Sequence, residues 1–310
     1  MRVLLTGGTG YLGQRIAQAL AARGHQLTVF ARSAEQAGLP GRACNGDIRD
    51  RRALEQAAAG CEAIVHTAAL VSIWQRGGGT IFDDVNVGGL RNVIDVAAAN
   101  GIGRIVYTSS FLARPPADSP TPIDANDYAR TKIAAERLAD DAVQRGAPII
   151  RLYPGVIYGP GARTEGNLLG RLIADHLRWR LPAIVGPEKI WSFAYVDDVA
   201  AGHSAAVECG ALGGRYALGG DNAPQRRAFE IVQQLTGRRP PLRMPFSVAV
   251  GLGVIEQSRA RLLGGTPLVT PGTVEILRHD WPLDSTDAVR DLGYTITPLA
   301  EGIRRTVASL

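Results

Sequence analysis

The sequence predicts an α/β protein built around a doubly wound parallel sheet. Short apolar strands alternate with helical stretches through the first half of the chain, and a glycine-rich turn joins the first strand to the first helix. After Pro160, glycine and proline become frequent and strand signals become sparse. We therefore expect a Rossmann domain over residues 1–160 and a smaller C-terminal substrate lobe over residues 161–310, with the segment around 190–220 able to return to the Rossmann sheet.

Each element of the first half has a local signal. The stretch 11–23 carries Leu12, Ile16 and Leu20 on one helical stripe, and Asp50 is expected to cap a later helix. The expected strands are 2–6, 26–31, 63–66, 104–108 and 149–153, and the expected helices are 11–23, 49–59, 85–100 and 128–145.

Composition excludes several classes of function. The net charge is +5, but the arginines are scattered among acidic residues, so no nucleic-acid partner is expected. No cysteine or histidine spacing suits a metal site. The longest apolar run, 246–255, is shorter than the ~20 residues that span a bilayer, and the chain starts directly with a strand. We expect a soluble cytoplasmic protein, and a homodimer is compatible with these features.

The loop from Thr6 to Gly13, Thr-Gly-Gly-Thr-Gly-Tyr-Leu-Gly, predicts a dinucleotide cofactor. The first glycine permits a tight turn, the next lets a pyrophosphate approach the backbone, and the last lets the helix pack close to the sheet. The helix N-terminus offers free N–H groups and a positive dipole end to the phosphates. The candidate cofactor residues of this loop are Thr6, Gly7, Gly10, Tyr11, Leu12 and Gly13.

The end of the second strand bears on the choice of cofactor. NAD-selective sites usually place a carboxylate there, but this chain has Ala31 followed by Arg32. A guanidinium beside the ribose suits a 2′-phosphate, so Arg32 favours NADP(H), unless it is merely solvated. Asp47 is a candidate to accept a hydrogen bond from the adenine amine, with Ile48 packed on the ring. The alternative for Asp47 is a loop or capping role.

A candidate catalytic set lies on the helix predicted over 128–145 and the strand before it. Tyr128 and Lys132 are four residues apart, so they share one helical face. A phenol has a reference pKa of about 10, and a nearby fixed positive charge favours its ionised form. Ser110 ends the preceding strand at the sheet edge where a substrate would lie.

Together these motifs resemble the extended short-chain dehydrogenases/reductases. Further matches to the family lie at 66–69, 86–87, 153–161 and 195–199. The stretches 87–93, 107–111 and 270–274 are most similar to farnesol dehydrogenase-like and dihydroflavonol reductase-like members. The resemblance implies that Ser110 orients a carbonyl, Tyr128 transfers a proton, and Lys132 holds the ribose and tunes Tyr128. Farnesol dehydrogenases are regarded as NAD enzymes, so NAD(H) remains the alternative cofactor. Further cofactor candidates by resemblance are Thr67, Ala68, Ala69, Tyr128, Lys132, Tyr153, Gly155 and Val156, and the substrate candidates are Ser110, Phe111 and Trp191.

The resemblance implies an oxidoreductase that interconverts an alcohol and a carbonyl. The alternative is a nucleotide-sugar epimerase or dehydratase, and a third interpretation is a dinucleotide sensor without chemistry. Sugar-nucleotide dehydratases that resemble this family carry an acidic pair after the active-site hydroxyl, where this chain has Phe111 and Leu112. Sugar-nucleotide enzymes also commonly carry an arginine where Trp191 stands. Retention of the Ser, Tyr and Lys set argues against a sensor.

We expect the substrate to be an apolar alcohol or ketone of isoprenoid, steroid or flavonoid type. The apolar run 246–255 is either buried in the core of the lobe or forms a lid whose apolar side faces the cleft, with Trp191, Phe193 and Leu268.

Overall fold

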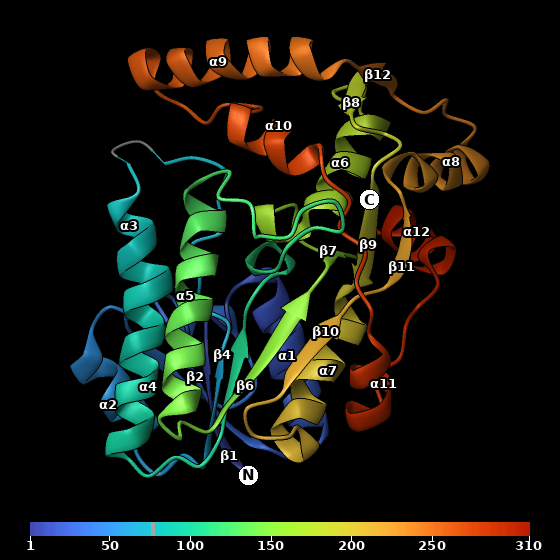
Figure 1. The fold of residues 1–310 in the computed structure, drawn as a ribbon. Coiled ribbons are helices and arrows are strands. Elements are labelled where there is room, and N and C mark those ends of the chain that lie inside the picture. The colour runs from blue at the N-terminus through green and yellow to red at the C-terminus, as the bar shows by residue number, and fades with distance from the viewer. Residues whose placement is uncertain (76–77) are drawn as a thin grey trace.

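The computed structural model describes residues 1–75 and 78–310 and confirms the predicted fold class (Figure 1). A seven-stranded sheet has the order β10-β6-β5-β4-β1-β2-β3, and every neighbouring pair in it is parallel. The first six strands have the Rossmann order, with β10 added beside β6. The strands are β1 (Arg2–Thr6), β2 (Gln26–Ala31), β3 (Arg42–Asn45), β4 (Ala63–His66), β5 (Ile105–Thr108), β6 (Ile149–Pro154) and β10 (Arg215–Leu218).

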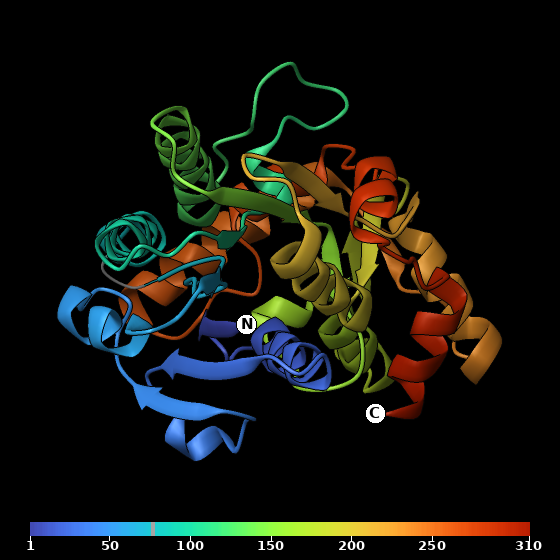
Figure 2. The same ribbon diagram turned by 90° about the horizontal axis from the view of Figure 1, so that it is seen from below.

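Both faces of this sheet are covered by helices (Figure 2). Successive strand residues point to opposite faces, so Leu5 packs in one apolar cluster and its neighbour Leu4 in the other. This double burial explains why the strands are apolar throughout rather than alternating. One face carries α1 (Tyr11–Ala22), α7 (Val196–Cys209) and α11 (Thr286–Leu292), and the other carries α2 (Arg51–Ala58), α4 (Gly89–Ala99) and α5 (Asp127–Gln144).

The helix predicted over 85–100 differs from the observed structure. The segment is a short α3 (Thr80–Phe82), then a π-helix η2 (Asp83–Gly88), then α4. The expected cap of α2 is present, because the Asp50 side chain accepts a hydrogen bond from the Ala53 amide at 3.1 Å. Apolar spacing located the segment, but it could not reveal the local change of helical pitch.

The expectation that strands are sparse after Pro160 is wrong. Residues 190–220 contribute strand β10 to the central sheet and helix α7 to one of its faces. Two small sheets lie beside the central sheet, with the strand orders β11-β9-β7 and β12-β8. The strands of these two sheets are β7 (Val156–Tyr158), β8 (Ala183–Val185), β9 (Ile190–Tyr195), β11 (Asp221–Pro224) and β12 (Leu242–Met244). The remaining helices are α6 (Leu168–Leu177), α8 (Gln225–Thr236), α9 (Phe246–Leu263), α10 (Pro271–Leu277), α12 (Leu299–Ala308) and the one-turn η1 (Glu35–Ala37), η3 (Phe111–Ala113) and η4 (Glu165–Asn167).

Neither interpretation of the apolar run 246–255 agrees with the structure. The run forms the first half of α9, which crosses the top of the molecule in Figure 1, and its side chains Val248 and Ile255 are exposed. Trp191 and Phe193 are buried in another cluster, and Leu268 is 87% exposed. The helix is therefore neither buried in the core nor a lid built with those three residues. No helix within 1–75 and 78–310 is long and apolar enough to cross a membrane.

A buried histidine links helix α7 to the end of strand β5. His203 of α7 is fully buried, and its Nδ1 donates to the Val199 carbonyl at 2.8 Å. Its Nε2 therefore accepts from the Thr108 hydroxyl at the end of β5, at 2.9 Å. Burial lowers the pKa of His203 from 6.5 to about 4. The ring is neutral in the folded protein at neutral pH.

We expect His203 to make the fold sensitive to acid. Between pH 6.5 and 4 the unfolded chain binds a proton at this residue that the folded chain does not, so the free energy of unfolding falls as pH falls. The loss is at most about 3 kcal/mol. Urea unfolding of His203→Gln and wild type at several pH values measures the difference, which should narrow toward pH 4. A difference that does not vary with pH would contradict the assignment.

Candidate active site

The site lies at the carboxyl edge of the central sheet, where β1 and β4 are neighbours and the strand order reverses. Thr6 ends β1 and His66 ends β4, and the Thr6 hydroxyl lies 2.8 Å from His66 Nδ1. Burial lowers the pKa of His66 to about 3, so its ring is neutral. This pair fixes the strand ends from which the two cofactor loops start.

The glycine loop packs directly on the segment that follows β4. Gly7 has φ +73°, and a Cβ there would lie 2.6 Å from the backbone N and Cα of Ala68. A Cβ on Gly13 would overlap the Gly7 carbonyl. The structure thus brings the predicted residues 6–13 and 67–69 together, and only glycine fits at these two close approaches.

The first turn of α1 suits a pyrophosphate. Gly10 precedes the helix, and within the described residues no side chain caps it. The first amides of a helix have no partner inside the helix, so those of Tyr11, Leu12 and Gly13 are available to an anion. The Tyr11 hydroxyl is buried and has no hydrogen-bond partner in the part of the chain described. The residues present therefore fit a dinucleotide.

Two of the residues expected to contact the adenosine, Asp47 and Ile48, already have partners within the protein. Asp47 accepts from Arg49, at 2.9 Å from Nε and 2.8 Å from Nη2, and these hydrogen bonds lower the pKa of Asp47 to about 2. Arg32 is exposed and near enough to lower that pKa further. Ile48 is buried against Gly89 of α4. Arg49, two residues beyond Asp47, was not predicted.

The structure brings the three candidate catalytic residues together. Asn126 caps α5 by accepting from the Ala129 amide at 2.9 Å, which places Tyr128 in the first turn and Lys132 one turn later. Ser110 caps η3 by accepting from the Leu112 amide at 3.2 Å, and its hydroxyl lies near enough to Tyr128 to lower the pKa of that phenol. The set lies beside the loops that fit the cofactor.

Burial, rather than the lysine, dominates the electrostatics of this set. Lys132 Nζ donates to the Thr108 carbonyl at 2.9 Å and lies 6.0 Å from the Tyr128 ring centre. Burial lowers the pKa of Lys132 to about 8 and raises that of Tyr128 to about 12. Desolvation of the phenol is therefore the larger effect on its pKa, and the tuning of Tyr128 by Lys132 stays a prediction.

A buried carboxylate that the sequence did not flag lies behind this set. Glu136 accepts from the Ser109 hydroxyl at 2.7 Å and from the Tyr153 hydroxyl. It also raises the pKa of Lys132, which partly offsets burial. Tyr153, which was predicted to bind the cofactor, uses its hydroxyl for this contact with Glu136, and its cofactor role stays a prediction. The spacing of Glu136 four residues after Lys132 was the available signal.

Asn86 is a second residue without a predicted role. It lies in η2, and its Oδ1 accepts from the Leu70 amide at 2.8 Å while its Nδ2 donates to Thr131 Oγ1 at 3.0 Å. It therefore ties the segment after β4 to the catalytic helix α5. A π-helical turn is frequently found at functional sites, and here it aims this one side chain.

The substrate candidates Phe111 and Trp191 share one apolar cluster. Phe111 meets the Trp281 ring edge-on, with ring centres 5.3 Å apart. Trp191 is buried in β9, and within the described residues its indole N–H has no partner.

Gly155 and Val156 lie where β6 passes into β7, and a Cβ on Gly155 would lie 2.5 Å from the Ser192 carbonyl. Across 1–75 and 78–310, no group of His, Cys, Asp or Glu could hold a metal ion.

The chain is similar to known proteins over most of its length. Residues 3–219 match the model of the NAD dependent epimerase/dehydratase family. The chain is 32% identical to sterol demethylase protein B of Methylococcus capsulatus, across 99% of this chain and 98% of that protein. It is 31% identical to 2-alkyl-3-oxoalkanoate reductase of Stenotrophomonas maltophilia, across 100% and 99%. The crystal structure of gox2253 matches with a TM-score of 0.83 and 28% identity, across 99% and 97%.

We expect Tyr128→Phe to abolish turnover while cofactor affinity stays near wild type. The ring is kept and only the transferable proton is lost, which costs ~10²- to 10⁴-fold in rate. Steady-state kinetics and cofactor titration measure the two effects. The control is Tyr158→Phe, which removes a buried hydroxyl that has no partner among the described residues. Wild-type activity in Tyr128→Phe would remove this residue from the mechanism.

Proposed function

The chain belongs to the NAD-dependent epimerase/dehydratase family, and we propose that it is an oxidoreductase that interconverts an alcohol and a carbonyl on a largely apolar substrate. The observation that carries this proposal is the convergence of Ser110, Tyr128 and Lys132 at the carboxyl edge of the sheet, where Lys132 is near enough to His66, the partner of Thr6, to lower its pKa. Retention of all three is what alcohol–carbonyl chemistry needs and what a sensor does not.

Each residue of the set has a distinct task. When bound, the nicotinamide would accept or supply the hydride. Tyr128, whose pKa is raised to about 12, is protonated at neutral pH and is ready to donate to a carbonyl oxygen. Ser110 orients that oxygen by a hydrogen bond. Lys132, held by the Thr108 carbonyl, keeps a positive charge near the phenol when the proton leaves it.

The proposal of an apolar substrate rests on the cluster that contains Phe111 and Trp191. Phe111 replaces the first residue of the acidic pair of sugar-nucleotide dehydratases, and Trp191 stands where a phosphate-binding arginine is common. Both changes exchange charge for apolar side chains in the cluster that contains Trp281. The names of the two relatives, a sterol demethylase protein and an alkyl-oxoalkanoate reductase, support the same class.

Sugar-nucleotide epimerization is the second candidate, favoured by the epimerases that give the family its name. One measurement separates the functions. A dehydrogenase produces a net absorbance change in the reduced-nicotinamide band when substrate is added, whereas an epimerase or a sensor does not. A screen of terpenoid, steroid and flavonoid alcohols and ketones with both cofactors would test the proposal.

Arg32 supports NADP(H) as the preferred cofactor. We expect Arg32→Ala to weaken NADPH binding tenfold or more and NADH binding little, because a charge-assisted contact is worth about 1.5–3 kcal/mol. Titration of both cofactors measures the change in preference, with the exposed Arg52→Ala as the control. Equal losses for both cofactors would mean that Arg32 stacks on adenine or only supports the loop.

Apolar recognition predicts a dependence on chain length. Burying one methylene yields about 0.8 kcal/mol, which is about fourfold in affinity, so affinity should rise along a series of prenyl alcohols. Binding should also survive high salt, because no charged anchor is involved. Competition binding along the series, at low and high salt, measures both. Best turnover of short polar substrates or of sugar nucleotides, or binding that collapses in salt, would refute this recognition mode.

A further inference from the structure

Helix α9 turns its large apolar side chains outward. Val248, Leu252, Ile255 and Leu262 follow one another at spacings of four, three and seven residues and therefore lie on one stripe. All four are exposed, Ile255 to 64% and Leu262 to 80%. An ordinary surface helix places such a stripe against the core.

The inward face of the same helix is made of small residues. Ala249, Gly253 and Ala260 are its buried positions, and a Cβ on Gly253 would lie 3.0 Å from the Pro271 nitrogen at the start of α10. Small residues allow α9 to approach the backbone of α10 closely. Helices α9 and α10 form a hairpin, and this close packing leaves the larger side chains of α9 on the outside. Their exposure therefore follows from the packing of the two helices.

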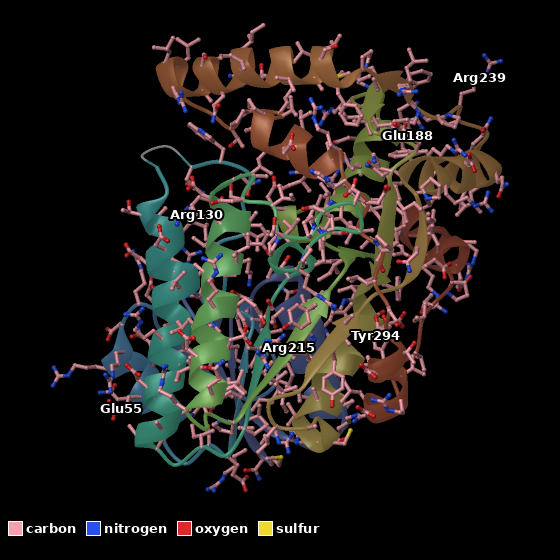
Figure 3. All side chains as sticks on the ribbon, in the orientation of Figure 1. Glu55, Arg130, Glu188, Arg215, Arg239 and Tyr294 are labelled. Atoms are coloured by element: carbon pink, nitrogen blue, oxygen red, sulfur yellow. The ribbon has the colours of Figure 1, made fainter. Side chains whose placement is uncertain are left out.

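Positive charge accompanies this apolar stripe. The segment 237–268 contains five arginines and a single carboxylate, Glu256. This segment therefore holds most of the excess positive charge of the chain, whose net charge is +5. Glu256 pairs with Arg259 at 2.9 Å, and Glu188, outside the segment, pairs with Arg243 at 3.5 Å. Figure 3 shows Arg239 projecting outward at the upper right, near α8 and beyond the first turn of α9. The arginines of the segment are Arg238, Arg239, Arg243, Arg259 and Arg261.

We propose that this face, defined as the α9 stripe with the arginines of 237–268, is a docking surface for an anionic lipid bilayer. Apolar side chains flanked by arginine suit a helix that lies in the plane of the membrane interface with its apolar side in the acyl boundary. A second copy of the chain is the less suitable occupant, because pairing this face with itself brings two positive segments together. The proposal concerns adsorption to the surface and requires no spanning helix.

The docking surface is connected to the catalytic helix. A Cβ on Gly272 of α10 would overlap the Ala125 carbonyl, so α10 packs against the residue just before the cap of α5. The hairpin of α9 and α10 therefore carries the membrane face on one side and contacts the start of the active-site helix on the other. This placement goes beyond the proposed function and does not depend on it.

Vesicle binding of the full chain, without substrate or cofactor, tests the proposal. Flotation uses vesicles of phosphatidylcholine alone and of phosphatidylcholine with phosphatidylserine. We expect binding to the mixed vesicles that weakens as salt rises from about 0.1 M to about 1 M, because the Debye length falls from about 10 Å to about 3 Å. Sedimentation of the protein alone, over a range of concentrations, tests the second-copy alternative.

Two pairs of substitutions separate the apolar and charged contributions. Ile255→Glu with Leu262→Glu should weaken vesicle binding roughly tenfold or more. Arg239→Gln with Arg261→Gln should weaken it by roughly fivefold for each charge and only on anionic vesicles. The control pair is Leu212→Glu with Val289→Glu, because both side chains are exposed apolar residues outside this face. Circular dichroism of each variant confirms folding.

The outcomes are distinct. We call Ile255→Glu with Leu262→Glu the α9 pair. Anionic-vesicle binding that the α9 pair removes and the control pair leaves intact supports the proposal. Absence of vesicle binding overturns the proposal. Binding that the α9 pair and the control pair reduce equally also overturns it. Self-association that the α9 pair abolishes, without vesicle binding, also overturns it and assigns the face to a second copy. None of these readouts uses catalysis, so failure here leaves the proposed function standing.

Discussion

The active-site geometry depends on three consecutive residues at the end of β5. Thr108 uses its carbonyl to hold Lys132 of α5 and its hydroxyl to hold His203 of α7, so it joins the helices on opposite faces of the sheet. Ser109 then binds Glu136, and Ser110 approaches Tyr128. The side chains of a strand alternate between faces, so one short strand end positions both layers. Displacing this strand end would move the catalytic set as a unit.

Burial sets the protonation states that the proposed chemistry uses. Desolvation lowers the pKa of Lys132 to about 8 and raises that of Tyr128 to about 12, so at neutral pH the lysine is mostly charged and the phenol is neutral. Glu136 opposes the desolvation of Lys132 from one helical turn away. The site thus keeps a cation next to a proton donor, although desolvation acts against the charge of each group.

Sequence pattern predicted the parts of the fold that depend on local order. The bounds of β1, β2 and β4 agree with the predicted strands because those strands are short, apolar and closed by turn residues. The strands after Pro160 were missed because glycine and proline interrupt the sequence there and the strands pair with segments distant in sequence. The glycine loop and the Ser, Tyr and Lys set were predicted from spacing and from the family resemblance. Glu136 and Asn86 were missed because a single polar residue on a helix does not reveal its partner.

The orientation of α9 marks the limit of pattern reasoning most clearly. Periodicity predicts which residues share a face, but it cannot state whether the protein core or another medium covers that face. Here the close approach of α10 to Gly253 selects the small-residue face as the inner one, and Val248 and Ile255 are left outside. Exposed apolar area of this kind is costly in water, whereas an arrangement with arginine beside it suits an interface with anionic lipid. The same hairpin reaches the start of α5 through Gly272, so the exposed apolar stripe is carried by a unit that also contacts the catalytic helix at its N-terminal end.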